Sequence, residues 1–214
     1  MNPLIDNLGP LLQALGTTLL MAVVAGVGSI VLGVLVTIAR VSPIPVLRTA
    51  AFLYVQFFIN VPLLALLLLA VFALPDAGLL LPLTPTAIIV LTVYEAAYVA
   101  EAVRSGVNTV PVGQVEASRA LGFTLGQSLR LVVVPQALRA VVQPIGNVMI
   151  ALAMNTALAA AVGVVELTAE VNKINLVAAQ PILIFSSAGI LYMAIALAIG
   201  LTAGWVERKV AIAR

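Results

Sequence analysis

Long uncharged stretches alternate with short groups of charged residues along the chain. Four of these stretches exceed the roughly 20 residues that a helix needs to cross a bilayer. They lie between Asp6 and Arg40, Arg48 and Asp76, Arg139 and Glu166, and Lys173 and Glu207. Residues 85–103 form a fifth apolar stretch, interrupted by Glu95 and Glu101. Backbone groups in lipid must be hydrogen-bonded within their own segment, so we predict five transmembrane helices, at about 12–38, 49–73, 85–104, 138–162 and 180–205.

The basic residues give these predicted helices an orientation. Lys173 lies on one side of the predicted bundle, and the other nine of the ten basic residues lie on the opposite side. These nine are Arg40, Arg48, Arg104, Arg119, Arg130, Arg139, Arg208, Lys209 and Arg214. Because cytoplasmic loops are enriched in Lys and Arg, we expect the N-terminus outside and the C-terminus in the cytoplasm. The chain, 1–214, is therefore predicted to be a single all-α transmembrane domain in the cell membrane.

Composition supports lipid as the solvent and excludes several functions. Hydrophobic residues make up 63% of the chain and charged residues 8%, whereas soluble domains carry roughly 25% charged residues. The net charge of +2 and the few aromatic residues give no basis for a nucleic-acid partner. Cysteine and histidine are absent, so we expect no catalytic thiolate or imidazole and no metal site.

The predicted cytoplasmic loop at 105–135 carries signals for two short helices. Residues 108–109 precede Pro111, the order expected for a capping residue and a proline in the first turn. Glu116 and Arg119 are spaced to form an ion pair on this first helix. Gly122 stands where the end of a helix needs a left-handed residue. We therefore predict a first helix that ends in a tight turn at Gly122.

A second helix is predicted directly after that turn. The segment Thr124–Gln127 has the pattern of a capping box, and Pro135 is expected to break or kink the helix before the fourth span. Phe123, Leu125 and Leu129 are apolar although the loop should face water. An apolar patch with a polar rim is typical of a docking surface for another protein. An amphipathic hairpin lying on the lipid surface is the alternative.

Part of this loop resembles the EAA loop of permease subunits in ATP-binding cassette importers. Its sequence runs EASRALG from Glu116 to Gly122 and VVVP from Val132 to Pro135. The EAA pattern has an acidic residue, two small residues, a glycine and an aliphatic run that ends in proline, at this spacing. In that family the segment forms a coupling helix that fits a groove on the ATPase subunit. The resemblance implies the same contact here, made by Glu116, Ala117, Ser118, Arg119, Gly122 and Phe123.

Further stretches between about residues 50 and 170 resemble the polar amino acid branch of that family. They are Asn60–Leu64, Ala97–Glu101, Ser105–Pro111, Pro135–Arg139, Asn155–Leu158 and Glu166–Leu167. The resemblance implies a type I importer fold, with two permease chains, an ATPase dimer and an external substrate-binding protein. It is greatest for the glutamate-uptake group, so glutamate or glutamine is the expected substrate. A permease for another small solute would share the coupling loop and stays an alternative.

No nucleotide-binding motif accompanies the loop. The phosphate-binding pattern Gly-x-x-x-x-Gly-Lys-Ser/Thr does not occur, and neither lysine, Lys173 or Lys209, follows such glycines. We therefore expect no cofactor on this chain and no enzymatic activity of its own, with ATP bound by the partner subunit.

One acidic residue lies near the middle of the third predicted span. An ionised carboxylate in lipid costs several kcal/mol unless it is paired or hydrated, so Glu95 is a functional candidate. It is predicted to line the translocation path and to contact the ammonium group of an amino acid. The alternative is a protonated or hydrogen-bonded acid held between helices. The same residue, if ionised, would repel an acidic substrate.

Polar and helix-breaking residues also interrupt the second and fourth spans. Irregular backbone at membrane depth is tolerated where it lines a cavity or is buried in protein, and hydrogen bonding between helices is the alternative role. The candidates for the substrate path besides Glu95 are Asn60, Pro62, Tyr98, Met154, Asn155 and Thr156, with Gln143 as a weaker one.

Two positions depart from the family pattern. Relatives usually have arginine where Ile59 stands and lysine where Met154 stands, so this chain lacks both cations. A heteromeric pair, in which the other permease chain supplies them, would account for the loss. Asp76 and the segment 166–173, in the predicted external loops, are expected to meet the substrate-binding protein.

Two other classes of membrane protein fit less well. An intramembrane protease needs a histidine base or two aspartates within the membrane, and the chain has neither. A secondary transporter usually has repeated halves and several ion-coupling acids, whereas Glu95 stands alone and no internal repeat is visible.

Overall fold

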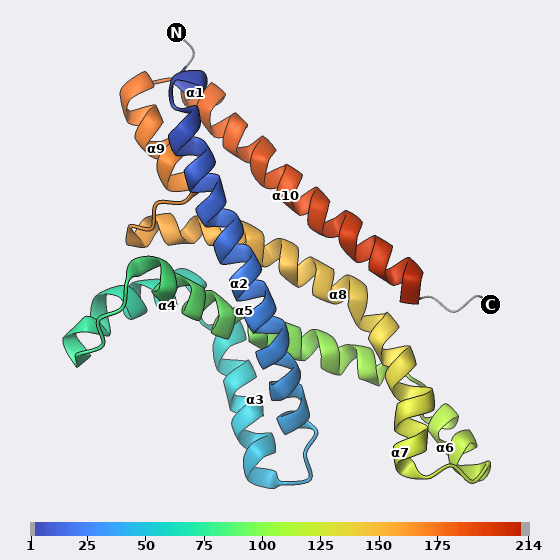
Figure 1. Cartoon of the computed structure of the whole chain (residues 1–214). Coiled ribbons are helices and arrows are strands. Elements are labelled where there is room, and N and C mark those ends of the chain that lie inside the picture. The colour runs from blue at the N-terminus through green and yellow to red at the C-terminus, as the bar shows by residue number, and fades with distance from the viewer. Residues whose placement is uncertain (1–2, 211–214) are drawn as a thin grey trace.

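The computed structural model describes residues 3–210, and these residues contain helices and connecting turns but no strand (Figure 1). The long helices are α2 (Leu8–Arg40), α3 (Pro45–Asn60), α5 (Leu83–Asn108), α8 (Val134–Asn155), α9 (Leu167–Ala178) and α10 (Pro181–Val210). The shorter ones are α1 (Pro3–Asp6), α4 (Leu63–Leu68), α6 (Val112–Ala120) and α7 (Leu125–Ser128). Two π-helical turns, Leu69–Ala73 and Leu129–Val133, and two 3₁₀ segments, Pro75–Ala77 and Thr156–Val162, complete the order.

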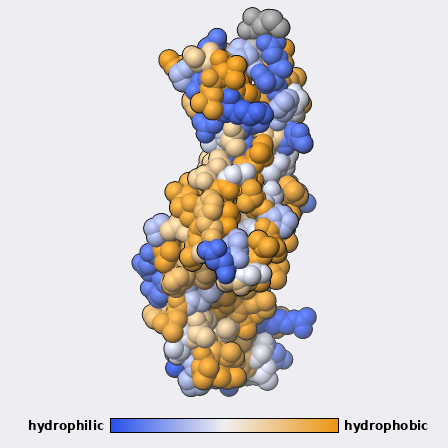
Figure 2. All heavy atoms as spheres, turned by 90° about the vertical axis from the view of Figure 1, so that its left-hand side faces the viewer, coloured by the Kyte–Doolittle hydropathy of each residue, from blue (hydrophilic) through white to orange (hydrophobic). Residues whose placement is uncertain are grey.

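Four helices are long and apolar enough to cross a membrane, namely α2, α5, α10 and the continuous helix Leu125–Val162. A fifth span is present if α3 and the Leu63–Ala73 segment, bent by 102° at their junction, form one crossing. Figure 2 shows hydrophobic residues over most of one face of the molecule, with hydrophilic residues in separate patches. Such an apolar exterior requires lipid around it.

The second predicted span, 49–73, is bent between α3 and α4, where Pro62 was expected to interrupt the helix. Pro62 has no N–H to donate and disfavours a helical conformation at the residue before it. Val61 is accordingly extended, with φ −104° and ψ 134°, and Pro62 caps α4. The second span is therefore two helices joined at a corner.

Helix α5 runs through the centre of the bundle and packs against α2, α3 and α8. Glycines permit two of these contacts. A Cβ atom on Gly33 of α2 would lie 2.6 Å from Val99 Cγ1, and one on Gly106 of α5 would lie 2.1 Å from Val141 Cγ1. The small residues therefore act as expected, since they let helix backbones approach closely in lipid.

Pro135 was expected to break or kink the helix before the fourth span, and the structure shows no break there. It lies in the first turn of α8, directly after the π-helical turn Leu129–Val133, and the helix continues from Leu125 to Val162. A π-helical turn shifts the hydrogen-bond register. In the first turn of the α-helical segment that follows, the backbone N–H groups have no intrahelical acceptor, so the missing N–H of proline costs no hydrogen bond. The fourth span changes from α-helical to 3₁₀ geometry at Thr156, directly after Asn155.

The segment 166–173 was expected to be an external loop, and it forms the start of α9 instead. Glu166 caps this helix by accepting a hydrogen bond from the Ala169 amide at 2.8 Å. Its side chain is fully buried and also accepts from Tyr192 Oη of α10 at 2.6 Å. Glu170 is buried as well. The proposed contact of these two acids with a binding protein is therefore wrong, whereas Lys173 and Asp76 are exposed.

Candidate coupling loop and membrane-embedded polar site

The first loop helix, α6, ends as the sequence predicts. Gly122 is left-handed, with φ +89°. Its amide donates to the Arg119 carbonyl at 3.0 Å, and the Phe123 amide donates to the Ser118 carbonyl at 3.1 Å. These two bonds form a Schellman motif, which satisfies carbonyls at the end of a helix. The left-handed residue reverses the chain and brings α7 back against α6.

A buried pair of hydroxyl groups joins the two loop helices. Ser118 Oγ lies 2.7 Å from Ser128 Oγ and is also hydrogen-bonded to the Val115 carbonyl at 2.8 Å. Both serines are buried, although the surrounding loop is exposed. Ser118 therefore holds the hairpin together and does not itself form part of its outer surface.

Three local details of the loop can be compared with expectation. The Thr124 capping box is confirmed, with Gln127 N donating to Thr124 Oγ1 at 3.3 Å and Thr124 N to Gln127 Oε1 at 2.8 Å. The ion pair between Glu116 and Arg119 is wrong, because Arg119 Nη1 donates to the Phe123 carbonyl at 2.8 Å. Asn108 ends α5, so Pro111 rather than the 108–109 pair caps α6.

The outer surface of the hairpin is partly apolar. Leu121 is 80% exposed and Leu125 is 60% exposed. Glu116, Ala117 and Arg119 are exposed beside them, and Phe123 is half-buried. We call this surface, Glu116, Ala117, Arg119, Leu121 and Leu125, the coupling face. It combines exposed leucines with charged neighbours, as a docking surface does.

The intramembrane acid has a partner that the sequence did not identify. Glu95 of α5 is 2% exposed, and its Oε1 accepts a hydrogen bond from Asn155 Nδ2 of α8 at 2.7 Å. Among residues 3–210, no group donates to Glu95 Oε2 or to Asn155 Oδ1. The pair thus presents two acceptor atoms that lack a partner. We call Glu95, Asn155 and the adjacent Tyr98 the polar site.

Tyr98, on the same helix as Glu95, contacts the corner between α3 and α4. Its hydroxyl lies 3.0 Å from Tyr94 Oη and 3.5 Å from the carbonyl oxygen of Ile59. Tyr98 follows Glu95 by three positions, so both lie on neighbouring parts of one face of α5. The irregular ends of α3 and α8 therefore meet at the same part of α5.

The other predicted path residues lie less directly at the polar site. Asn60 donates to the carbonyl of Gln56 in its own helix at 2.7 Å, and Thr156, which is buried, donates to the carbonyl of Ala153 at 2.7 Å. Pro62 makes the corner, and Met154 is partly exposed beside Asn155. Gln143 is bonded elsewhere, because it donates to Glu207 of α10 at 2.5 Å.

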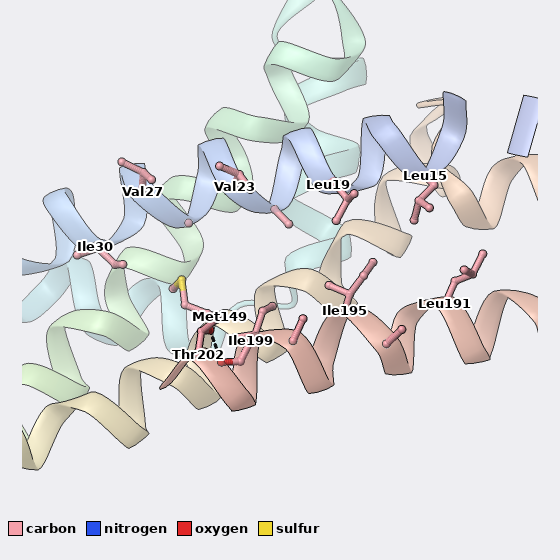
Figure 3. Close-up of a pocket in the computed structure, with 14 residues that line it drawn as sticks. Leu15, Leu19, Val23, Val27, Ile30, Met149, Leu191, Ile195, Ile199 and Thr202 are labelled. Atoms are coloured by element: carbon pink, nitrogen blue, oxygen red, sulfur yellow. Dashed lines mark hydrogen bonds between the residues drawn. The ribbon is translucent and has the colours of Figure 1, made fainter. Parts of the chain in front are cut away.

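An apolar hollow of about 620 Å³ lies between α2 and α10, with Met149 of α8 beside it (Figure 3). Aliphatic side chains such as Leu19 and Ile195 line it, and the hydroxyl of Thr202 is occupied by the Ile199 carbonyl at 2.7 Å. The lining of this hollow includes no charged side chain and no residue of the polar site. The hollow is therefore separate from the polar site and unsuited to a polar solute.

An ionic cluster that was not predicted lies at the ends of α2 and α5. Glu101 is paired with Arg40 of α2 and with Arg104 of α5. The spacing of Glu101 and Arg104 is typical of a pair on one helix. No local signal could reveal Arg40, because that contact joins residues 61 positions apart.

Comparison with known proteins decides the family. Residues 29–212 match the family described as "Binding-protein-dependent transport system inner membrane component". The chain belongs to this family. It is therefore a multi-pass permease subunit of a binding-protein-dependent importer, and membership implies an ATPase and a substrate-binding protein as partners. The membrane protease and secondary transporter are thereby excluded.

Individual relatives cover almost the whole permease. The "Probable glutamine ABC transporter permease protein GlnM" of Bacillus subtilis is 32% identical over 209 residues, which cover 96% of this chain and 95% of the relative. The "Glutamate transport system permease protein GluC" of Corynebacterium efficiens is 34% identical over 226 residues, which cover 99% of each.

Solved structures show the same fold. The structure described as "Crystal structure of an amino acid ABC transporter with histidines" has a TM-score of 0.90 at 26% identity and covers 96% of both chains. A chain of the MetNI methionine ABC transporter in an inward-facing conformation has a TM-score of 0.77 at 26% identity, covering 97% of this permease and 99% of that chain. The predicted type I importer permease fold is confirmed.

Proposed function

We propose that this permease carries a polar amino acid, with glutamine or glutamate as the leading candidates, through a path that includes the polar site. The unpartnered acceptors of the Glu95–Asn155 pair carry this proposal. An ammonium group has three donors and a positive charge, so Glu95 Oε2 and Asn155 Oδ1 together suit it. The names of the similar permeases, which specify glutamine and glutamate transport, support the substrate class.

The charge of Glu95 distinguishes between the two candidates. An ionised Glu95 carboxylate repels the extra negative charge of an acidic substrate, whereas a neutral amide side chain adds no such repulsion. The proposal therefore favours glutamine over glutamate as the better substrate. Competition between the two amino acids for uptake by the reconstituted transporter measures this preference directly.

The group that binds the substrate carboxylate belongs, in this proposal, to another permease chain. The family resemblance implies that Ile59 and Met154 stand where related permeases have cations. Both lie beside the polar site, because the Ile59 carbonyl contacts Tyr98 and Met154 precedes Asn155. An amino acid held here by its ammonium still needs a cation for its carboxylate. A heterodimer whose partner chain keeps arginine and lysine at these positions supplies it.

Energy enters through the coupling face, which we propose to dock in a groove of the ATPase subunit. Glu116, Ala117, Arg119 and Gly122 would make or shape the contact, with Phe123 half-buried behind it. ATP is bound and hydrolysed by that partner. Closure of the ATPase dimer moves the two hairpins together, and the bundle exchanges its inward-facing form for an outward-facing one.

Glu95→Gln tests the substrate role. A hydrogen bond to a charged group contributes about 1.5–3 kcal/mol, so we expect the KM for glutamine to rise about ten- to hundredfold. The measurement is ATP-driven uptake into proteoliposomes that contain the permeases, the ATPase and the binding protein. Glu207→Gln is the matched control, because Glu207 also accepts from an amide side chain, that of Gln143. An unchanged KM and substrate preference in Glu95→Gln would rule out the contact.

A further inference from the structure

A basic hollow at the ends of α2, α3 and α5 is separate from both the polar site and the coupling face. It has a volume of about 390 Å³, within the roughly 300–1,000 Å³ range of small-molecule sites. Its lining consists of Arg40, Val41, Arg48, Thr49, Phe52 and Arg104. Three guanidinium groups thus converge on one hollow.

The charges in this hollow are not balanced. Glu101 pairs with both Arg40 and Arg104, so one carboxylate faces three arginines. Arg48 is exposed and makes no ion pair or side-chain hydrogen bond within residues 3–210, and the Thr49 hydroxyl is likewise unbonded there. An anion in this hollow could bind the free guanidinium of Arg48 and the free hydroxyl of Thr49. The guanidinium groups of Arg40 and Arg104, which Glu101 holds in position, lie beside them.

The same hollow also has an apolar side. Phe52 is 45% exposed, and the guanidinium of Arg40 lies 5.5 Å from the centre of its ring. Val41 is exposed next to Arg40, and Val46 and Leu47 are exposed on the first turn of α3. An inorganic anion would use only the arginines, whereas a molecule with a charged head and an apolar chain would use both sides.

The position along the membrane normal points to lipid. Arg40 ends the first span and Arg48 lies in the first turn of the next, on the side that the positive-inside rule assigns to the cytoplasm. Anionic headgroups lie at this level, and basic pockets between membrane helices bind them. We propose that the hollow binds the phosphodiester headgroup of an anionic phospholipid, whose acyl chains lie along Phe52 and the apolar start of α3.

Arg48→Gln tests the site without breaking an internal contact, because Arg48 has no partner among the described residues. The purified complex of the permease with its co-purifying subunits is reconstituted in nanodiscs of phosphatidylcholine alone or mixed with phosphatidylglycerol. Lipid retention is measured by native mass spectrometry after detergent extraction. Each arginine near a membrane surface contributes about fivefold in affinity for an anionic lipid, so phosphatidylglycerol retention should fall about fivefold in the variant.

Arg208→Gln is the matched control, since Arg208 is an exposed arginine at the same side of the membrane, on α10 and outside the hollow. It should retain phosphatidylglycerol as the wild type does. Inorganic phosphate, added to the wild type, should not displace the lipid; displacement at millimolar concentration would show a site for free phosphate and overturn the lipid proposal. Equal retention of phosphatidylglycerol by the wild type and Arg48→Gln would also overturn the proposal. So would an Arg48→Gln complex that keeps its lipid but loses a co-purifying subunit.

Discussion

The turn at Gly122 offers the sharpest test of how the permease is coupled to its ATPase. Its φ of +89° lies in the left-handed region, and a Cβ atom there would meet no heavy atom within 4 Å. A Cβ atom therefore has room at this position, and we expect the effect of valine to come from backbone strain. A left-handed L-residue costs roughly 1–2 kcal/mol, and β-branching makes the conformation rarer still.

A cost of this size changes the population of the turn considerably. About 1–2 kcal/mol corresponds to a factor of roughly 5–30 in an equilibrium. The Schellman bonds from Gly122 and Phe123 would be lost in the relaxed form, and the coupling face would turn away from its docked orientation. We expect Gly122→Val to insert into the membrane normally but to hydrolyse more ATP per amino acid transported, or to lose its ATPase during purification.

Two other glycines provide matched controls for this variant. Gly113 lies in α6, also without a heavy atom near a Cβ, but has ordinary helical geometry. Gly78 is left-handed, with φ +85° and equally open surroundings, but follows the second span far from the loop. Gly113→Val and Gly78→Val should keep the normal ratio of ATP hydrolysed to substrate moved. Normal coupling in Gly122→Val, or uncoupling in all three variants, would refute this reasoning.

Two further predictions concern packing. Ser118→Ala leaves the buried Ser128 hydroxyl without its partner, which costs about 1–3 kcal/mol and should weaken retention of the ATPase in pull-down assays; the double variant with Ser128→Ala should recover most of it. Gly33→Ala places a methyl group 2.6 Å from Val99 Cγ1, so the thermal midpoint of the detergent-solubilised permease should fall. The same methyl group would lie 2.7 Å from Val99 Cβ and 2.9 Å from the Ala96 carbonyl oxygen, which Val99→Ala leaves in place, so this second change should restore only part of the loss. An unchanged midpoint in Gly33→Ala would contradict the close packing of α2 against α5.

Features set by short stretches of sequence were predicted well. The gaps between charged residues located the spans because a charge inside lipid is costly wherever the helix packs. The turn at Gly122 and the box from Thr124 to Gln127 were also predictable, since each depends on hydrogen bonds between residues three to five positions apart.

Features set by distant contacts were missed. Glu95 was recognised as unusual, but its partner Asn155 lies 60 positions away. The segment 166–173 was predicted to be an external loop, whereas Glu166 and Glu170 are buried. Their burial depends on α2 and α10, which supply Thr18 and Tyr192 as partners to Glu166. Pro62 predicted a break in the second span, but not the 102° angle of the corner.

The central claim, that this chain is the permease of an amino acid importer driven by a partner ATPase, is tested most directly by transport. The permeases, the ATPase and the binding protein are reconstituted in liposomes, and uptake of labelled glutamine is followed with and without ATP. We predict uptake that requires ATP, binding protein and this chain together, and that excess unlabelled glutamine abolishes. ATP-dependent uptake of some other solute, with none of any amino acid, would contradict the account.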